Sequence, residues 1–271
     1  MSVLFDILNM DLPFVELCAG SAAVAMRLCG QSPPVSYAGN KRGYADAILE
    51  TFGIDKNANR PIVLVEPGRW GETWAVLRVP EKRNAICDRI VLLRGGDARQ
   101  TWLQAKDDMA HSNDDVTKCA AHLLVVAGTH GGFEKGGFKG KHKRRPNVDG
   151  FIPNRDSIAK RVKALDIAQD DVSVCHQDAR EIVPFKSYCY IDPPYKNTTG
   201  YENCLERNDV VDLAIKWDGA GAHVVVSEGE PIHELTKRGW QTKNITKQRT
   251  GQHRKNSVSK SEWLTFNFAP K

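Results

Sequence analysis

The chain has 271 residues, of which 41% are hydrophobic and 26% charged, and its formal net charge is +5. This composition is typical of a folded globular protein and excludes a disordered chain. The longest apolar run, residues 123–128, is far too short to cross a bilayer, and no basic segment precedes the first apolar residues. We therefore expect no membrane association and a cytoplasmic location.

The cysteines are scattered along the chain, seven in number and without a C-x-x-C pair. That pattern predicts reduced, mostly buried thiols. Cys119 and His122 have a helical spacing that a metal could use, but no second pair of ligands is evident, so we predict no metal site.

The first predicted unit is a buried strand, a tight glycine turn and a helix, within residues 13–28. We expect Ser21 to open this helix, because apolar residues with helical spacing follow it. A second helix is predicted over residues 43–52, and a compact apolar strand over residues 61–66.

Helical patterns dominate the next hundred or so residues. Three helices are predicted, over residues 70–79, 82–93 and 113–127. Asn113 is the expected N-cap of the third. Residues 128–153 lose periodicity and are crowded with glycines and basic residues, as in a long functional loop or hairpin. A further helix is predicted over residues 156–167.

Strand patterns return in the last part of the chain. The predicted strands cover residues 172–175, 187–191, 223–227, 240–246 and 263–268. Strands that alternate with helices at both ends of the chain predict an α/β fold with a mostly parallel sheet covered on both faces. Residues 1–66 and 171–271 would form this domain, and residues 67–170 would form a helical and irregular insertion outside the sheet.

Acidic residues and a glycine stand at the ends of several predicted strands. These are Glu16, Gly20, Glu66, Asp178 and Asp192. Ligands of such sheets bind beyond the carboxyl ends of the strands, so we expect one crevice to collect all five.

The tetrapeptide Asp192-Pro193-Pro194-Tyr195 follows an apolar strand and can carry specific chemistry. The exocyclic amine of a nucleobase is a poor nucleophile, because its lone pair is delocalised into the ring. The Asp192 carboxylate and the Pro193 carbonyl could accept its two N–H groups and stabilise the positive charge that builds during attack. Pro194 would hold that carbonyl in place, and Tyr195 would stack on a base that has left the duplex. The alternative is that two prolines only end a strand and stiffen a loop.

Two basic runs lie within residues 135–145 and 237–260. Either run alone could be a solvated surface, but two runs beside a catalytic candidate favour a polyanionic partner. The candidate contacts to nucleic acid are Lys139, Lys141, Lys143, Arg144, Arg145, Lys247, Arg249 and Arg254.

Several segments together share the pattern of one enzyme family. They are Phe14-Val-Glu16-Leu-Cys-Ala-Gly20-Ser21, Tyr37-Ala-Gly-Asn-Lys41, Gly131-Gly-Phe133 with Asn147–Pro153, His176-Gln-Asp178, Asp192–Tyr195 with Thr199-Gly-Tyr201, Val224–Ser227 and Glu262–Phe266. In this combination they resemble the cofactor loop, the Y-x-G-x-K segment, the recognition region, the acidic turn, the active-site motif and the later strands of Dam-like DNA adenine-N6 methyltransferases.

The resemblance implies a Rossmann-like, S-adenosylmethionine-dependent methyltransferase whose insertion recognises the target. Such an enzyme, orphan or restriction-associated, transfers a methyl group from S-adenosylmethionine to a flipped-out adenine in double-stranded DNA, without a metal. The implied catalytic residues are Asp192, Pro193, Pro194 and Tyr195, and Tyr201 joins the DNA contacts. The implied cofactor contacts are Phe14, Glu16, Gly20, Ser21, Tyr37, Lys41, Glu66 and Asp178.

The chain departs from the family pattern around the cofactor loop. Leu17 stands where a proline is usual, and Ala22 where a second glycine is usual. The segment that contains Lys41 follows the loop, whereas in the family it precedes it. An ordinary lysine at the start of a helix is therefore the alternative for Lys41.

Other functions remain open at this point. The same chemistry would serve an N4-cytosine or an RNA methyltransferase, because the motif constrains the amine and not the polymer. A non-catalytic DNA-binding module and an NAD-dependent oxidoreductase are further alternatives. The intact Asp192 and Tyr195 argue against the first, and the lack of G-x-G-x-x-G argues against the second. A partner nuclease cannot be read from the sequence.

Overall fold

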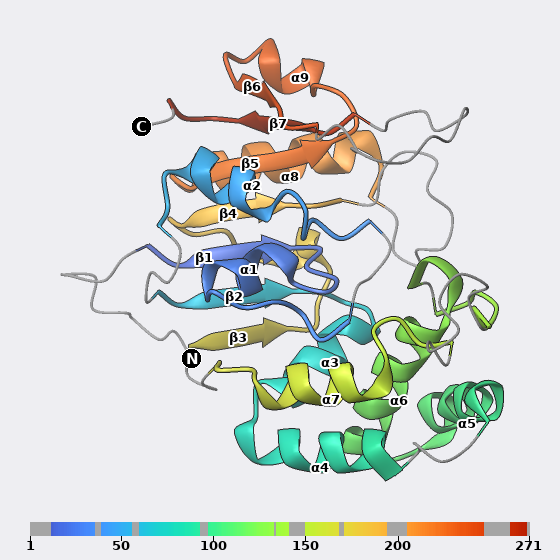
Figure 1. Cartoon of the computed structure of the whole chain (residues 1–271). Helices are drawn as coiled ribbons and strands as arrows, with labels where there is room; N and C mark the ends of the chain where they lie inside the picture. The colour runs from blue at the N-terminus through green and yellow to red at the C-terminus, as the bar shows by residue number, and fades with distance from the viewer. Residues whose placement is uncertain are drawn as a thin grey trace, which may run out of the picture.

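A seven-stranded sheet lies at the centre of the computed structural model, with helices on both of its faces (Figure 1). The structure describes residues 12–35, 39–55, 60–92, 97–132, 134–140, 150–167, 171–193, 205–246 and 261–269. No helix in these ranges is both long enough and apolar enough to cross a lipid bilayer.

The sheet is parallel except for one strand. Its strands are β1 (Phe14–Leu17), β2 (Ile62–Val65), β3 (Val172–Cys175), β4 (Tyr188–Ile191), β5 (His223–Glu228), β6 (Gln241–Asn244) and β7 (Trp263–Phe266). They are arranged in the order β3-β2-β1-β4-β5-β7-β6, and only β7 runs antiparallel to its neighbours. The prediction of an α/β fold with a mostly parallel, Rossmann-like sheet is confirmed. The strand order reverses between β1 and β4, the point at which doubly wound sheets bind their ligands.

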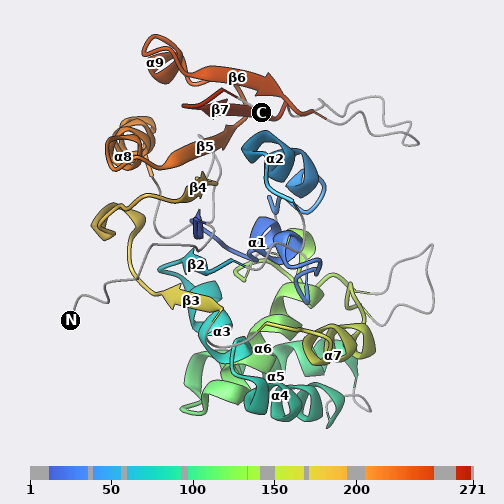
Figure 2. The ribbon, with the colours of Figure 1, turned by 90° about the vertical axis from the view of Figure 1, so that its left-hand side faces the viewer.

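Each face of the sheet is covered by its own layer of helices. Helices α1 (Ala23–Leu28) and α2 (Ala45–Phe52) cover one face, and α8 (Arg207–Gly219) covers the other, as Figure 2 shows edge-on. Alternate residues of β1 serve the two layers: Phe14 belongs to the first hydrophobic cluster and Val15 to the second. All four residues of β1 are buried, as expected of a central parallel strand.

A further group of helices lies beyond the β3 edge of the sheet (Figure 1). They are α3 (Arg69–Leu77), α4 (Pro80–Leu92), α5 (Ala98–His111), α6 (Asp115–Gly128), the short η2 (His130–Gly132) and α7 (Arg155–Lys163). Residues 119–128 of α6 are all buried, because α3, α4 and α5 pack around this helix. The region predicted to be irregular contains a β-bridge between Thr129 and Phe138.

Some local predictions were wrong. Ser21 does not cap α1; the N-cap is Ala22, which has the left-handed angles φ 51° and ψ 45°. The N-cap of α6 is Asp114 and not Asn113, since the Asp114 carboxylate accepts a hydrogen bond from the Thr117 amide. The sequence reasoning also missed α5 and α8, as well as two short elements, η3 (Ala179–Glu181) and α9 (His233–Thr236).

Candidate functional site

Asp192 lies directly after β4, at the point where the strand order reverses. The preceding residue, Ile191, pairs with Leu17 at the end of β1, and the Asp192 amide donates to the Leu17 carbonyl over 3.3 Å. Pro193 follows and is buried. The sheet therefore fixes the backbone of the first two residues of the tetrapeptide, while Pro194 and Tyr195 lie outside the described residues.

One oxygen of the Asp192 carboxylate holds two partners. Oδ1 lies 2.8 Å from Lys41 Nζ and accepts a hydrogen bond from the Ser227 hydroxyl over 3.0 Å. Because that hydroxyl has one hydrogen and donates it to Asp192, the Tyr190 hydroxyl 2.9 Å away must be the donor to Ser227. No contact to Oδ2 occurs within the described part of the chain. Oδ2 is thus left as an acceptor for another group.

Lys41 supplies the positive charge next to Asp192. Its side chain is only 5% exposed, and Nζ lies 3.7 Å from the Glu262 carboxylate as well as 2.8 Å from Asp192. A third carboxyl group, that of Glu228, lies close enough for the charges of Lys41 and Asp192 to act on it. Burial raises the pKa of Glu228. The structure therefore places Lys41, a predicted cofactor contact, next to Asp192, the predicted catalytic acid. Its predicted role as a ligand contact stays a prediction.

The loop after β1 has an unusual backbone. Cys18, Gly20 and Ala22 have φ angles of 57°, 47° and 51°, so every second residue is left-handed. Only glycine adopts this conformation without steric cost. Three amides of this loop bond within the protein: Ala19 donates to the Val65 carbonyl, Gly20 to the Glu66 carboxylate and Ala22 to the Ala19 carbonyl.

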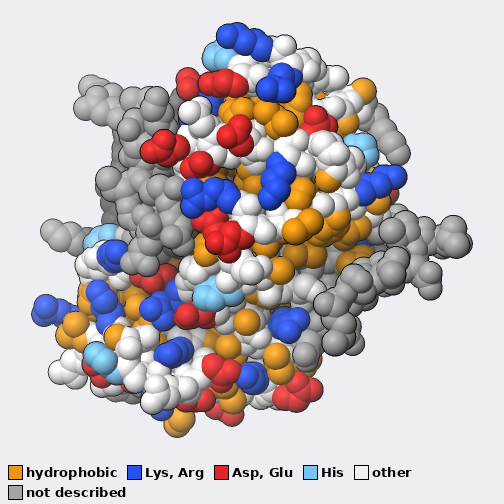
Figure 3. Space-filling model, turned by 180° about the vertical axis from the view of Figure 1, so that it is seen from behind, with side chains coloured by type: hydrophobic (Ala, Val, Ile, Leu, Met, Phe, Trp, Pro, Cys, Tyr) orange, Lys and Arg blue, Asp and Glu red, His pale blue; other side chains and the backbone are white. Residues whose placement is uncertain are grey.

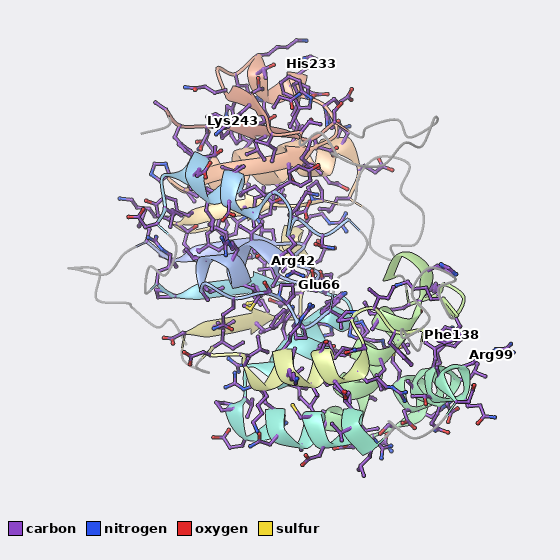
Figure 4. All side chains as sticks on the ribbon, viewed as in Figure 1. Arg42, Glu66, Arg99, Phe138, His233 and Lys243 are labelled. Atoms are coloured by element: carbon purple, nitrogen blue, oxygen red, sulfur yellow. The ribbon has the colours of Figure 1, made fainter. Side chains whose placement is uncertain are left out.

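Glu66 and Trp74 hold Gly20 from its two sides. The Glu66 carboxylate accepts hydrogen bonds from the Gly20 and Gly68 amides, each over 2.9 Å. Trp74 of α3 donates its indole N–H to the Gly20 carbonyl over 3.0 Å. Burial raises the pKa of Glu66, whereas the two amide hydrogen bonds lower it. Glu66 stands at the carboxyl end of β2 (Figure 4), so the acid predicted to bind a ligand also fixes the loop.

Glu16 is buried beneath the start of α1, close enough to Asp192 and Lys41 for their charges to act on it. It is 2% exposed, and its carboxylate accepts a hydrogen bond from the Ala25 amide of α1 over 2.7 Å. Burial raises its pKa from 4.5 to about 8, and the charge of Asp192 adds to that effect. Phe14 lies at the opposite end of β1 and packs edge-on against Phe52. The structure does not bring Phe14 to the acids at the carboxyl end of the sheet.

Asp178 is, with Glu66 and Asp192, one of three carboxylates whose charges act on Cys18. Asp178 caps η3 and pairs with Arg180 over 2.7 Å, and hydrogen bonds from that arginine lower its pKa. The pKa of the Cys18 thiol is raised by burial and then by the charges of Glu66, Asp192 and Asp178. These three predicted acids thus lie near one another, and a shared crevice for a ligand stays a prediction.

Many predicted contacts lie outside the described residues. These are Tyr37, Lys141, Lys143, Arg144, Arg145, Tyr201, Lys247, Arg249 and Arg254, together with Pro194 and Tyr195. Ser21 is described and is 2% exposed within the loop. Lys139 is described too and is half-buried, and burial lowers its pKa. On the face seen from behind, basic and acidic side chains are intermixed (Figure 3).

His122 is a structural residue of the insertion. It is fully buried; Nδ1 lies 2.7 Å from the Thr73 hydroxyl and Nε2 lies 3.1 Å from the Glu134 carboxylate. Cys119 contacts the Thr73 carbonyl. Within the ranges that the structure covers, no group of three or more side chains could hold a metal ion.

Three residues of the site were missed by the sequence reasoning: Ser227, Glu262 and Trp74. Ser227 stands near the carboxyl end of β5, and Glu262 stands directly before β7. Because β7 runs antiparallel to β5, both residues lie at the same edge of the sheet. Polar residues at those strand ends were a readable signal for the first two. Trp74 gave no such signal in the sequence, because it contacts a residue, Gly20, that lies 54 positions away.

Comparison with known proteins adds no assignment. No family model matches the chain, and no curated protein has a significant sequence match to it. Support for a function therefore comes from the residues of the chain and their geometry.

Proposed function

We propose that the protein is an S-adenosylmethionine-dependent DNA methyltransferase of the Dam-like type, which methylates the N6 amine of an adenine flipped out of double-stranded DNA. The observation that carries this proposal is the Asp192 carboxylate, whose Oδ1 is held by Lys41 and Ser227 and whose Oδ2 has no partner among the described residues. Asp192 Oδ2 and the Pro193 carbonyl are the two acceptors that an exocyclic amine needs.

The ion pair with Lys41 supports this role. An amine develops positive charge as it attacks, and an ionised carboxylate stabilises that charge better than a neutral carboxylic acid. Two hydrogen-bonding partners on Oδ1 also fix the orientation of the carboxylate, which reduces the reorganisation required during the reaction. Lys41 and Ser227 are therefore positioning residues for Asp192.

The groups around the loop after β1 fit S-adenosylmethionine. They are mainly carboxylates, of which Glu66 and Asp178 stand next to the loop. Carboxylates accept hydrogen bonds from ribose hydroxyls and from an adenine amine, and they favour a sulfonium cation. When bound, this cofactor would supply an electrophilic methyl group, while the chain provides orientation and electrostatics.

The direct test is methyl transfer in vitro. Purified protein is incubated with tritium-labelled S-adenosylmethionine and duplex DNA, and the nucleosides are then separated. We expect label in N6-methyladenine. The variant Asp192→Ala should reduce the rate by about 100-fold or more, as when a charge-stabilising group is lost, and leave cofactor binding nearly unchanged. Asp212→Ala, on the exposed side of α8, is the matched control.

The alternatives have distinct outcomes in the same assay. Label in N4-methylcytosine or only in RNA would support the same chemistry on another target. Binding of DNA and cofactor without any transfer would support a non-catalytic module. Full activity of Asp192→Ala would remove this residue from the mechanism.

A further inference from the structure

A basic pocket lies where the insertion meets the segment that leads into α2. It has a volume of about 420 Å³, and its lining includes Arg42, Gly131, Gly132, Lys139, Pro153 and Arg161. These residues come from the turn before α2, from η2, from the bridged segment after it and from α7. Figure 4 shows Arg42 between the sheet and the helices of the insertion. Three cationic side chains from separate elements therefore converge on one hollow.

The three cations have no acidic partner in the described residues. Arg161 donates to the Pro34 carbonyl over 3.3 Å, and Lys139 reaches the Ala127 carbonyl only at 3.5 Å. Some other arginines of this chain are neutralised; Arg89, for example, pairs with Asp108 over 3.2 Å. Within the described part of the chain, the pocket therefore carries positive charge that no acidic side chain balances.

This charge is unfavourable in the absence of an anion. Burial lowers the pKa of Arg161, and the neighbouring Arg42 charge lowers it further. Arg42 and Arg161 are thus close enough to repel each other. An anion between them would reverse the sign of that interaction and accept hydrogen bonds from both guanidinium groups.

The backbone of the pocket suits a bulky oxyanion. Gly131 and Gly132 have φ angles of 72° and 77°, which strain any residue with a side chain. Without side chains at these two positions, tetrahedral oxygens can come close to the main chain.

The pocket is tied to the candidate active site through the chain itself. Arg42 follows Lys41 directly, and adjacent Cα atoms are about 3.8 Å apart. Lys41 reaches Asp192 while Arg42 lines the pocket. The pocket and the candidate active site therefore use the side chains of two adjacent residues.

We propose that this pocket binds one backbone phosphate of the double-stranded DNA that presents its base to Asp192. This proposal rests on the methyltransferase function proposed above and adds the group that sets the position of the DNA. Phosphate contacts fix the register of a protein on a duplex without reading its sequence. Guanidinium groups match phosphate oxygens in geometry as well as in charge.

The first test compares DNA binding of the double variant Arg42→Gln/Arg161→Gln with that of the unchanged protein. We expect the Kd for a duplex to rise about tenfold at low salt, and the slope of log K against log salt to become shallower by about 0.9 for one lost phosphate. Binding of S-adenosylmethionine should not change, and the Tm should not fall, because the variant removes two cations that repel each other. Arg99→Gln is the matched control, because Arg99 is exposed on α5, far from the pocket (Figure 4).

The second test locates the phosphate. Duplexes are prepared with a neutral methylphosphonate at one backbone position at a time. For the unchanged protein we expect one position near the target base at which the substitution weakens binding. The same substitution should have no effect on the double variant, because the two changes remove one contact. Additive effects at every position, or an unchanged salt slope, would overturn the proposal.

The outcomes separate this proposal from the function on which it rests. If the unchanged protein methylates DNA but the variants bind it normally, only the pocket proposal fails. If the unchanged protein neither binds nor methylates DNA, both fail. Inorganic phosphate provides the last comparison: if it raises the Tm of the unchanged protein but not of the double variant, while DNA binding is identical, the pocket takes a free anion and the proposal is wrong.

Discussion

Replacing Glu16 with glutamine should stabilise the protein above neutral pH. The carboxylate lies in the middle of the central strand, 2% exposed, and holds the Ala25 amide. Glutamine keeps an oxygen that can accept this hydrogen bond but cannot ionise. The substitution therefore removes one titration and leaves the packing nearly unchanged.

The magnitude follows from the pKa. Burial raises the pKa of Glu16 from 4.5 to about 8. Between these values the folded state holds a proton that the unfolded state releases, so stability falls as pH rises from about 4.5 and levels off above about 8. Each pKa unit corresponds to about 1.4 kcal/mol, which gives a total of about 5 kcal/mol. The part of this loss between pH 6 and pH 8 is about 2 kcal/mol.

Urea unfolding followed by tryptophan fluorescence measures this difference. The free energy of unfolding is determined at pH 6 and pH 8 for the unchanged protein, for Glu16→Gln and for Glu50→Gln, a control on the exposed side of α2. The advantage of Glu16→Gln over the unchanged protein should grow by about 2 kcal/mol between the two pH values. Parallel profiles, within about 0.5 kcal/mol, would refute the raised pKa.

Two further predictions concern the ion pair and the loop. Lys41→Met should lower the free energy of unfolding at pH 7 by about 3 kcal/mol, because it removes the ammonium group that pairs with Asp192 and lies near Glu262; a loss below about 1 kcal/mol in urea unfolding would contradict this. Ala22→Gly should be neutral within about 0.5 kcal/mol, since relief of the left-handed backbone offsets the lost methyl group. Ala25→Gly, inside α1, should cost about 2 kcal/mol in the same measurement, and equal losses for the two variants would show that Ala22 is not strained.

The sequence predicted the sheet well because its strands are short apolar runs bounded by polar residues. The strand predicted over residues 172–175 coincides with β3, and that over 187–191 contains β4. The edge strand β6 is all exposed, and its predicted bounds were too wide by three residues in total. Burial on both faces gives a clear pattern, whereas exposure gives a weak one.

The missed helices have different reasons. In α5 the buried residues Trp102, Ala105 and Met109 are separated by many polar ones, so the apolar stripe is narrow. In α8 the buried residues Val210, Leu213 and Trp217 have clear helical spacing, so this helix was predictable from the sequence.

The candidate site was partly predictable. Acids after strands can be found in the sequence, because parallel strands deliver their carboxyl ends to one edge. The contact of Lys41 with Asp192 joins residues 151 positions apart and depends on how α2 packs on the sheet. The left-handed Cys18 and Ala22 carry no sequence signal either, because neither is a residue that favours that conformation.

The central claim is that Asp192 presents an acceptor to the N6 amine of adenine in DNA. The most direct measurement is sequencing, with direct detection of modified bases, of DNA from a host that lacks adenine methylation and expresses this chain. We expect N6-methyladenine at one short sequence for the unchanged chain and none for Asp192→Ala. Unmodified adenines with the unchanged chain, or the same modification with both, would contradict it.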